Sequence, residues 1–293
     1  MKYCLGTVQF GLNYGIQNNG KPTEQQVCEL LKKAILNDIT TFDTAVAYGD
    51  SEKILGKFLK TNYSNELKVI SKISSEVLDS VNNTESVKEL NRHIEASLSR
   101  LQINELYGML YHDSKVVNCP DRIKALLKTK SNNKVKKVGV SIYTPDEALK
   151  ALEYDIDIIQ VPYNLFDNRL GKVNFFKKAK EKGLEIYARS SLLQGLALMD
   201  ESKLPMNMLF AKEYIEKFGN LCLKYNIDRL STAVNYVAAN EYVDYIVFGV
   251  DNMEQLLQYI SIRNNDLPRG LIEDIKKEFD DVPEKLVNPA LWK

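Results

Sequence analysis

The feature that most constrains the fold is a regular alternation of short apolar runs with longer amphipathic segments. The short runs are rich in β-branched and aromatic residues and have the length of strands. Because a helical segment follows each of them, the strands are expected to run parallel, joined by right-handed crossovers. The predicted strands are Lys2–Gly6, Thr40–Asp43, Leu67–Ser71, Tyr107–Tyr111, Val135–Ser141, Ile156–Val161, Leu184–Arg189 and Tyr242–Phe248.

Helix signals separate these strands. Thr23 and Gln26 have the spacing of a capping box. Thr144, followed by Pro145 and then Glu147, predicts the start of a second helix. Eight strand–helix units predict an α/β protein with a single (β/α)8 barrel, the TIM barrel, and we favour it over an open, doubly wound sheet.

Composition narrows the class of protein. Of 293 residues, 44% are hydrophobic, and 39 basic residues balance 39 acidic ones, so we expect no nucleic-acid partner. Four scattered cysteines without a CxxC pair argue against a metal site and against disulfides. No signal-peptide pattern, membrane-length apolar run or linker is found. We expect one cytoplasmic domain over residues 1–293, with no metal and no membrane partner. The cysteines are Cys4, Cys28, Cys119 and Cys222.

Four polar residues fall where a barrel has its active site, at the carboxyl ends of consecutive strands. Asp43, Lys72 and His112 end the second, third and fourth predicted strands, and Tyr48 follows Asp43 by five residues. Carbonyl reduction needs an acid, and a tyrosine with a pKa near ~10 is a reluctant one. A neighbouring lysine held by an aspartate would lower that pKa, and a neutral histidine would orient the carbonyl. Each residue alone also fits an ordinary rim or loop role, whereas the four together predict catalysis. The other histidine, His93, is expected to have a surface or packing role in a helix.

Motifs around these residues resemble those of the aldo-keto reductase family over essentially the whole chain. The resemblance implies carbonyl reduction with NADPH or NADH, although no GxGxxG loop is present. It also implies a catalytic tetrad of Asp43, Tyr48, Lys72 and His112, with Tyr48 as the general acid. The motifs are Leu5–Gly11, Phe42–Ala45, Tyr48–Gly49, Ser51–Glu52, Val138–Ser141, Arg189–Gly195, Gly249–Leu256 and the ending Asn288–Pro289 with Trp292.

The same resemblance implies where the cofactor binds. Ser141 and Gln160 correspond to residues that hold the nicotinamide carboxamide. The segment after the seventh strand is similar to a cofactor loop, and the segment after the eighth is similar to a helix start that receives the adenine-side phosphate. The implied cofactor residues are Gly6, Thr7, Asp43, Ser141, Gln160, Arg189, Ser190, Leu192, Gln194, Gly195, Gly249, Asp251, Asn252, Gln255 and Gln258.

Three departures from the family pattern bear on function. Ile142 stands where many members have asparagine, which removes one carboxamide contact. Arg189 stands where many have a tyrosine on the nicotinamide ring, and it either stacks there, reaches an anionic substrate or pairs with a carboxylate. Gly249 and Gln255 are not basic, and Asp251 adds negative charge where a 2′-phosphate would approach. NADH use is therefore a hypothesis.

Two other functions remain open at this point. A barrel aldolase or lyase would form a Schiff base at Lys72, and some family members act as cofactor-binding regulatory subunits. The opening Gln9–Gly15 and the Arg189–Ser190 pair resemble a bacterial branch often associated with surface-sugar synthesis. We therefore expect a small carbonyl substrate, a keto sugar or sugar-acid derivative, and the family default of a monomer.

Overall fold

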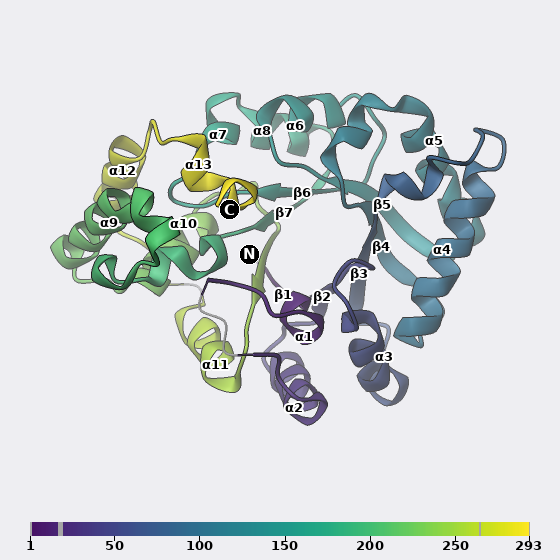
Figure 1. The fold of residues 1–293 in the computed structure, drawn as a ribbon, viewed down its shortest axis with the longest axis horizontal. Helices are drawn as coiled ribbons and strands as arrows, with labels where there is room; N and C mark the ends of the chain where they lie inside the picture. The colour runs from purple at the N-terminus through teal and green to yellow at the C-terminus, as the bar shows by residue number, and fades with distance from the viewer. Residues whose placement is uncertain (1, 17–19, 264, 293) are drawn as a thin grey trace.

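Eight parallel strands close into one barrel in sequence order in the computed structural model, which describes residues 2–16, 20–263 and 265–292. The last strand pairs with the first, with Gly6 opposite Gly249. This closure confirms the predicted (β/α)8 barrel (Figure 1). The strands are β1 (Lys2–Gly6), β2 (Thr41–Asp43), β3 (Lys68–Ile73), β4 (Leu106–Tyr111), β5 (Val135–Ser141), β6 (Ile158–Pro162), β7 (Glu185–Arg189) and β8 (Tyr245–Gly249).

Two strands, β6 and β8, begin more than one residue later than the sequence predicts, for a common reason. Asp157 and Asp244 directly precede the regions where β6 and β8 form, and their side chains are already hydrogen-bonded to the neighbouring strand. The Asp157 carboxylate accepts from the Val138 amide at 2.9 Å, and the Asp244 carboxylate accepts from the Ile186 amide at 2.8 Å. The backbone amide of each aspartate also donates to the neighbouring strand, so only the next acceptor is a carboxylate in place of a backbone carbonyl.

Helices surround the strands, and their predicted starts are confirmed. Both capping boxes form, at Thr23 with Gln26 and at Thr144 with Glu147. The α-helices are α1 (Val8–Gly11), α2 (Glu24–Ile35), α3 (Ser51–Asn62), α4 (Ser86–Leu101), α5 (Pro120–Lys128), α6 (Pro145–Ala151), α7 (Arg169–Lys172), α8 (Phe175–Glu181), α9 (Lys212–Tyr225), α10 (Arg229–Ala238), α11 (Met253–Ile262), α12 (Arg269–Glu278) and α13 (Glu284–Val287). Short 3₁₀ helices are η1 (Ser75–Leu78), η2 (Ser114–Asn118), η3 (Thr129–Asn132), η4 (Leu193–Leu198), η5 (Glu201–Lys203), η6 (Met206–Ala211) and η7 (Pro289–Leu291).

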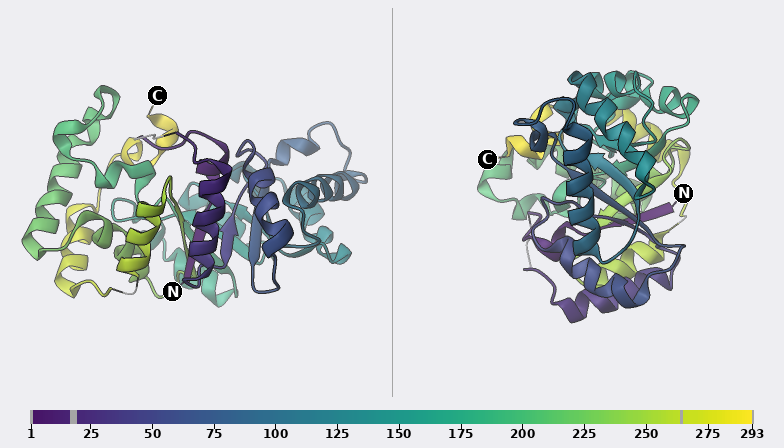
Figure 2. Two further views of the ribbon diagram at one scale, coloured as in Figure 1. Left: turned by 90° about the horizontal axis from the view of Figure 1, so that it is seen from below. Right: turned by 90° about the vertical axis from the view of Figure 1, so that its right-hand side faces the viewer.

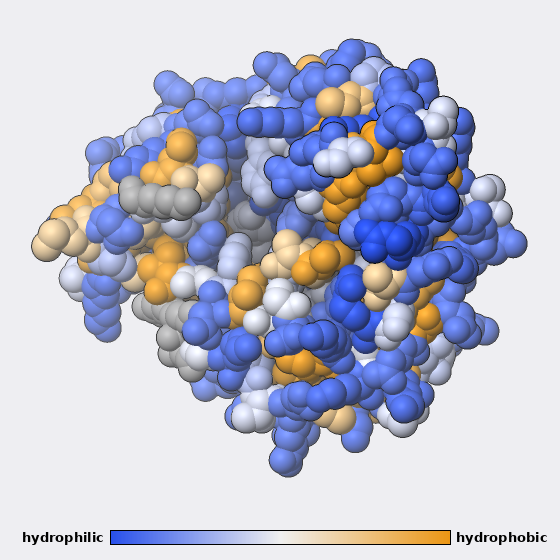
Figure 3. Space-filling model, turned by 45° about the vertical axis from the view of Figure 1, so that its right-hand side comes forward, coloured by the Kyte–Doolittle hydropathy of each residue, from blue (hydrophilic) through white to orange (hydrophobic). Residues whose placement is uncertain are grey.

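The C-terminal helices α9 and α12 gather at one end of the molecule, and α4 and α5 lie at the other (Figure 2). Hydrophilic side chains dominate the face drawn in Figure 3, where hydrophobic side chains form separate patches. Within the described ranges, no helix has both the length and the apolar character needed to cross a membrane.

The barrel interior is filled at its amino-terminal end. Tyr187 and Tyr245 stack with ring centroids 4.4 Å apart inside the barrel. Glu185 lies beside them and accepts hydrogen bonds from Tyr107 at 2.7 Å and from Lys137 at 2.7 Å. Because the interior is packed with side chains, the carboxyl-terminal mouth is the place where a ligand can enter.

All four cysteines are free. Among the residues that the structure describes, no cluster of histidine, cysteine, aspartate or glutamate has the geometry to hold a metal ion.

Candidate active site

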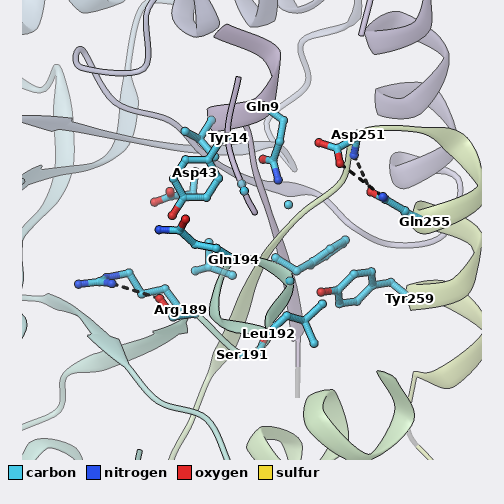
Figure 4. Close-up of a pocket in the computed structure, with 18 of the residues that line it drawn as sticks. Gln9, Tyr14, Asp43, Arg189, Ser191, Leu192, Gln194, Asp251, Gln255 and Tyr259 are labelled. Atoms are coloured by element: carbon cyan, nitrogen blue, oxygen red, sulfur yellow. Dashed lines mark hydrogen bonds between the residues drawn. The ribbon is translucent and has the colours of Figure 1, made fainter. Parts of the chain in front are cut away.

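A cavity of about 300 Å³ opens at the carboxyl-terminal mouth of the barrel. In the close-up, Asp43 and Arg189 lie on one side of this cavity, and Asp251, Gln255 and Tyr259 lie on the other (Figure 4). The cavity is therefore lined by side chains from strands that are distant in sequence. The candidate residues that line it are Gly6, Asp43, Tyr48, Gln160, Arg189, Ser190, Leu192, Gln194, Gly195, Gly249, Asp251, Gln255 and Gln258.

The other candidate residues lie outside the cavity wall. Thr7, Lys72 and Ser141 are buried beneath it. His112 is half-buried and directly follows β4, with its ring centroid 5.5 Å from that of Tyr48. Asn252 is exposed and caps α11 by accepting from the Gln255 amide at 2.9 Å. Of these residues, His112 lies near enough to Tyr48 for one ligand to contact both side chains.

Lys72 is the centre of a buried hydrogen-bond network. It lies within β3, one residue before the strand ends, and its side chain is fully buried. Its ammonium group donates to Asp43 Oδ2 at 2.6 Å, to the Thr44 carbonyl at 2.9 Å and to Tyr48 Oη at 3.3 Å. Gln160 Nε2 donates to the other Asp43 oxygen at 2.8 Å. All three ammonium N–H bonds and both carboxylate oxygens are thus used, which a buried ion pair requires.

The charge state of Lys72 follows from this network. Burial opposes the ammonium form, but the Asp43 carboxylate and the Tyr48 phenol outweigh it, so the pKa of Lys72 is raised. Lys72 therefore stays charged at neutral pH.

For Tyr48 the structure corrects the sequence prediction. Lys72 favours the phenolate, as expected, and Arg189 does so too, but burial and the Asp43 carboxylate outweigh them and the net pKa of Tyr48 is raised. The side chain is half-buried in the cavity wall, and removing a phenolate from water costs free energy. Tyr48 is consequently a fully protonated donor at neutral pH.

His112 is neutral, as predicted. Burial and the positive charges of Lys72 and Arg189 lower the pKa of His112 from 6.5 to about 3. A neutral imidazole has one N–H to donate and one nitrogen to accept, so it suits an uncharged carbonyl oxygen. His93, by contrast, lies on α4, is partly exposed and bonds to Glu89 at 3.0 Å, in line with the surface or packing role expected.

The depressed pKa of His112 predicts a loss of stability in acid. Between pH 3 and pH 6.5 this histidine is protonated in the unfolded chain but not in the folded chain. Its contribution to the free energy of unfolding is therefore fully present above pH 6.5 and is lost as the pH falls. At pH 5.5 the loss from this residue is about 1.4 kcal/mol. Between pH 7.5 and pH 5.5, we expect the free energy of unfolding of His112→Gln to fall by about 1.4 kcal/mol less than that of the wild type, as measured by urea denaturation. An equal loss in both proteins would contradict the buried neutral histidine.

Close backbone packing fixes the loop that carries Tyr48. A Cβ atom at Gly11 would overlap the Tyr48 carbonyl, and Gly49 has φ 58° with its own hydrogen pressed against the Gly11 carbonyl. Thr7 and Ser51 share a buried hydrogen bond of 2.7 Å, which ties the start of α3 to the end of β1. Glycine is needed at both positions because a side chain would push the loop away. The tyrosine is thus placed by the close approach of the backbone at Gly11 and Gly49 and by the Thr7–Ser51 bond.

Glu52 anchors the same helix from the other side. Its carboxylate is buried and accepts from Ser71 at 2.6 Å and from Arg100 at 2.6 Å. The signature pair Ser51–Glu52 therefore has a structural role in positioning Tyr48.

Arg189 ends β7 and lies in the cavity wall. Its guanidinium carbon is 4.4 Å from the ring centroid of Tyr143. Nη2 donates to the Ile142 carbonyl at 3.0 Å, and Nη1 donates to Ser190 Oγ at 3.2 Å. Across the described ranges of the chain Arg189 forms no ion pair, so the carboxylate pairing considered from the sequence is wrong.

The opposite side of the cavity carries a negative charge. Gln255, in the first turn of α11, accepts from the Asp251 amide at 2.7 Å through its side chain. Burial raises the pKa of Asp251 above its usual range, although the Gln255 amide opposes the shift. No lysine lines the cavity, and Arg189 is its only basic residue within the described part of the chain.

Several lining residues were not assigned from the sequence. Tyr14 and Gly15 belong to the loop after α1, and the Ile16 amide reaches across to the Gln194 carbonyl at 3.1 Å. Gln9 Oε1 is buried without a hydrogen-bond partner beside Gly249. The motif Gln9–Gly15 was visible in the sequence, but only the folded loop shows that it lies against Gln194 of η4. The other unassigned lining residues are Val8, Ser191, Leu198, Leu230, Val247, Phe248 and Tyr259.

Comparison with known proteins agrees with this geometry. The profile of the Aldo/keto reductase family matches residues 2–278. The uncharacterized oxidoreductase YrpG of Bacillus subtilis is 26% identical and covers 95% of this chain and 92% of its own. D-arabinose 1-dehydrogenase of Saccharomyces cerevisiae is 25% identical, covering 82% and 77%. An aldo-keto reductase from Bacillus halodurans, solved in a holo form, has the same fold, with a TM-score of 0.75 at 18% identity over 94% of this chain and 91% of that one. With a barrel mouth that joins Asp43, Tyr48, Lys72 and His112, the chain belongs to the aldo/keto reductase family of oxidoreductases.

Proposed function

We propose that the protein reduces the carbonyl group of a small molecule to an alcohol, with Tyr48 as the general acid and NADH or NADPH as the hydride source. The observation that carries the proposal is the single hydrogen bond at Tyr48 Oη, which accepts from Lys72 at 3.3 Å. Among the described residues no acceptor takes the phenol hydrogen, so it is free to point into the cavity. A substrate carbonyl oxygen is the natural acceptor there.

The roles of the tetrad follow from its charges. The phenol donates its proton to the oxygen that becomes the alcohol, and the adjacent ammonium group of Lys72 stabilises the phenolate left behind. Asp43 keeps that ammonium in place through the 2.6 Å ion pair. His112, neutral and edge-on to Tyr48, donates a second hydrogen bond that orients the carbonyl.

The cavity residues fit a nicotinamide dinucleotide. Its wall is rich in amide and hydroxyl groups and contains four glycines, where the backbone can approach a ligand closely. Gln9 Oε1 is buried without a hydrogen-bond partner among the described residues and can accept a hydrogen bond from a ligand. Gln160 and the carboxyl end of β1 would hold the nicotinamide end, and the amino terminus of α11 would bind a phosphate. The bound cofactor supplies the hydride.

The alternative reaction at Lys72 is disfavoured. A Schiff base requires a neutral, accessible amine, and Lys72 is fully buried, charged and bonded through all three N–H groups. No observation favours a purely regulatory role, because each member of the tetrad is present and in contact.

A keto sugar or sugar-acid derivative remains our proposal for the substrate. It is supported by the polar lining of the cavity and by the likeness to a relative named for its action on D-arabinose. Hydroxyl groups of such a substrate match the amide and hydroxyl side chains of the wall.

We expect NADH to bind more tightly than NADPH. Among the described residues, the cavity wall around Asp251 has no basic side chain. A 2′-phosphate bound there would have no cationic partner and would lie next to the Asp251 carboxylate, which repels it. Calorimetric titration with both cofactors at equal ionic strength measures this directly. Asp251→Ser is expected to strengthen NADPH binding several-fold and to leave NADH binding nearly unchanged. Tighter NADPH binding by the wild type would overturn the preference, and binding of neither at millimolar concentration would overturn the reductase proposal.

A further inference from the structure

The charge on Arg189 bears on which carbonyl compounds the cavity accepts, and the inference rests on the proposed carbonyl reduction. We infer that the substrate carries an oxyanion, a carboxylate or a phosphate, which Arg189 binds while the carbonyl group lies between Tyr48 and His112.

Arg189 is held in a fixed orientation before any ligand arrives. Tyr143 covers one face of its guanidinium, and the Ile142 carbonyl and Ser190 Oγ each accept one N–H. Ser190 itself has φ 64°, a left-handed conformation that a non-glycine residue adopts at a cost. Of the five N–H groups of a guanidinium, three are left for a ligand. An arginine held this way loses little side-chain entropy on binding an anion.

The positive charge on Arg189 is not neutralised within the site. The other cation, Lys72, is paired with Asp43 at 2.6 Å. Glu147, which follows the Ile142–Tyr143 segment, is committed elsewhere, because its carboxylate accepts from the Thr144 amide and from Ser114. Arg189 forms no ion pair with any residue that the structure describes, and its side of the cavity therefore has one excess positive charge.

This charge lies within reach of the reacting atoms. Arg189 and Asp43 lie on the same side of the cavity (Figure 4), and the field of Arg189 acts on both Tyr48 and His112. Arg189 and Tyr48 line the same cavity. A ligand with an anion a few bonds from its carbonyl can contact both residues, and its charge is opposite to that of Arg189.

Matched pairs of aldehydes test the inference. Succinic semialdehyde is compared with butanal, and glyceraldehyde 3-phosphate with glyceraldehyde, so that carboxylate and phosphate are judged separately. We expect the wild type to prefer at least one anionic member over its neutral partner. In Arg189→Gln the kcat/KM for that anion is expected to fall about 10- to 100-fold, mainly through KM, as loss of a charged hydrogen bond requires. The readout is the ratio of kcat/KM for the anionic and neutral members, because the field of Arg189 at Tyr48 and His112 affects both members alike.

Three further measurements make the outcome decisive. Arg189→Lys keeps the charge but loses the planar fork, and we expect it to restore part of the preference. Arg92→Gln, on the exposed face of α4, makes the same change in net charge and is expected to alter neither member of a pair. Calorimetric titration of Arg189→Gln with NADH measures how much of the loss comes from the cofactor, and we expect it to be smaller than the loss in kcat/KM for the anion.

Several results would overturn the inference. Equal rates for anionic and neutral aldehydes in the wild type would do so while leaving the proposed function intact. A loss of NADH affinity in Arg189→Gln as large as the loss in kcat/KM would assign Arg189 to the cofactor instead. If no aldehyde is reduced and NADH does not bind, the proposed function fails, and this inference fails with it.

Discussion

Replacing Tyr48 with phenylalanine is expected to lower kcat by about 10³-fold while leaving the affinity for the cofactor close to that of the wild type. The phenylalanine ring keeps the packing against His112, whose ring centroid lies 5.5 Å away. What is lost is the donor, since Lys72 cannot take its place while it is bound to Asp43 and to the Thr44 carbonyl. Steady-state kinetics and calorimetric titration measure the two effects independently.

The Tyr48→Phe result is interpretable only with a matched control. Tyr63→Phe makes the same chemical change at an exposed tyrosine that ends α3, and we expect wild-type kinetics from it. A Tyr48→Phe protein that keeps most of its turnover would remove Tyr48 from the role of acid. A protein that loses turnover and cofactor binding together would show that the residue is needed for the shape of the cavity.

Replacing Lys72 with methionine is expected to abolish turnover and to lower the free energy of unfolding by about 3–5 kcal/mol. Methionine has about the volume of the lysine stem, so packing inside the barrel is retained. The cost arises at Asp43, whose side chain is 4% exposed and which keeps only the hydrogen bond from Gln160 at 2.8 Å. Urea denaturation at neutral pH measures the loss.

A double variant separates charge from packing at this position. Asp43→Leu combined with Lys72→Met replaces the whole ion pair by apolar groups, and we expect it to recover most of the lost stability and none of the activity. Equal stability of the wild type and Lys72→Met would show that the pair is better solvated than its burial indicates. Turnover in the double variant would contradict the role assigned to the pair.

The order of elements could be predicted from the sequence because it depends on local chemistry. Strands such as Val135–Ser141 and capping boxes such as Thr23 with Gln26 depend on residues that are close together in the sequence. The sequence-based prediction failed at strand starts where a carboxylate takes the place of a backbone acceptor, as at Asp244, because that bond joins residues 58 positions apart.

In the candidate site, too, local features could be predicted from the sequence and long-range contacts could not. Asp43, Tyr48, Lys72 and His112 were predicted because barrel geometry brings strand ends together whatever the loops do. Gln9 and Tyr14 were not assigned to the cavity, since their place in it depends on how the first loop meets Gln194. The direction of the Tyr48 pKa was also missed, because burial is a property of the packed mouth and cannot be read from neighbouring residues.

By itself, then, the sequence determined the barrel and placed Asp43, Tyr48, Lys72 and His112 at or near its strand ends, and it has no basic residue at Gly249 or Gln255. The tertiary structure alone decided that Lys72 is saturated with hydrogen bonds, that His112 is neutral and that Arg189 forms no ion pair with another described residue. The physical reason is the separation in sequence between the groups that interact. Propensity, periodicity and capping act over a few residues, whereas desolvation and Coulomb interactions depend on every group within several ångströms, and only folding brings those groups together.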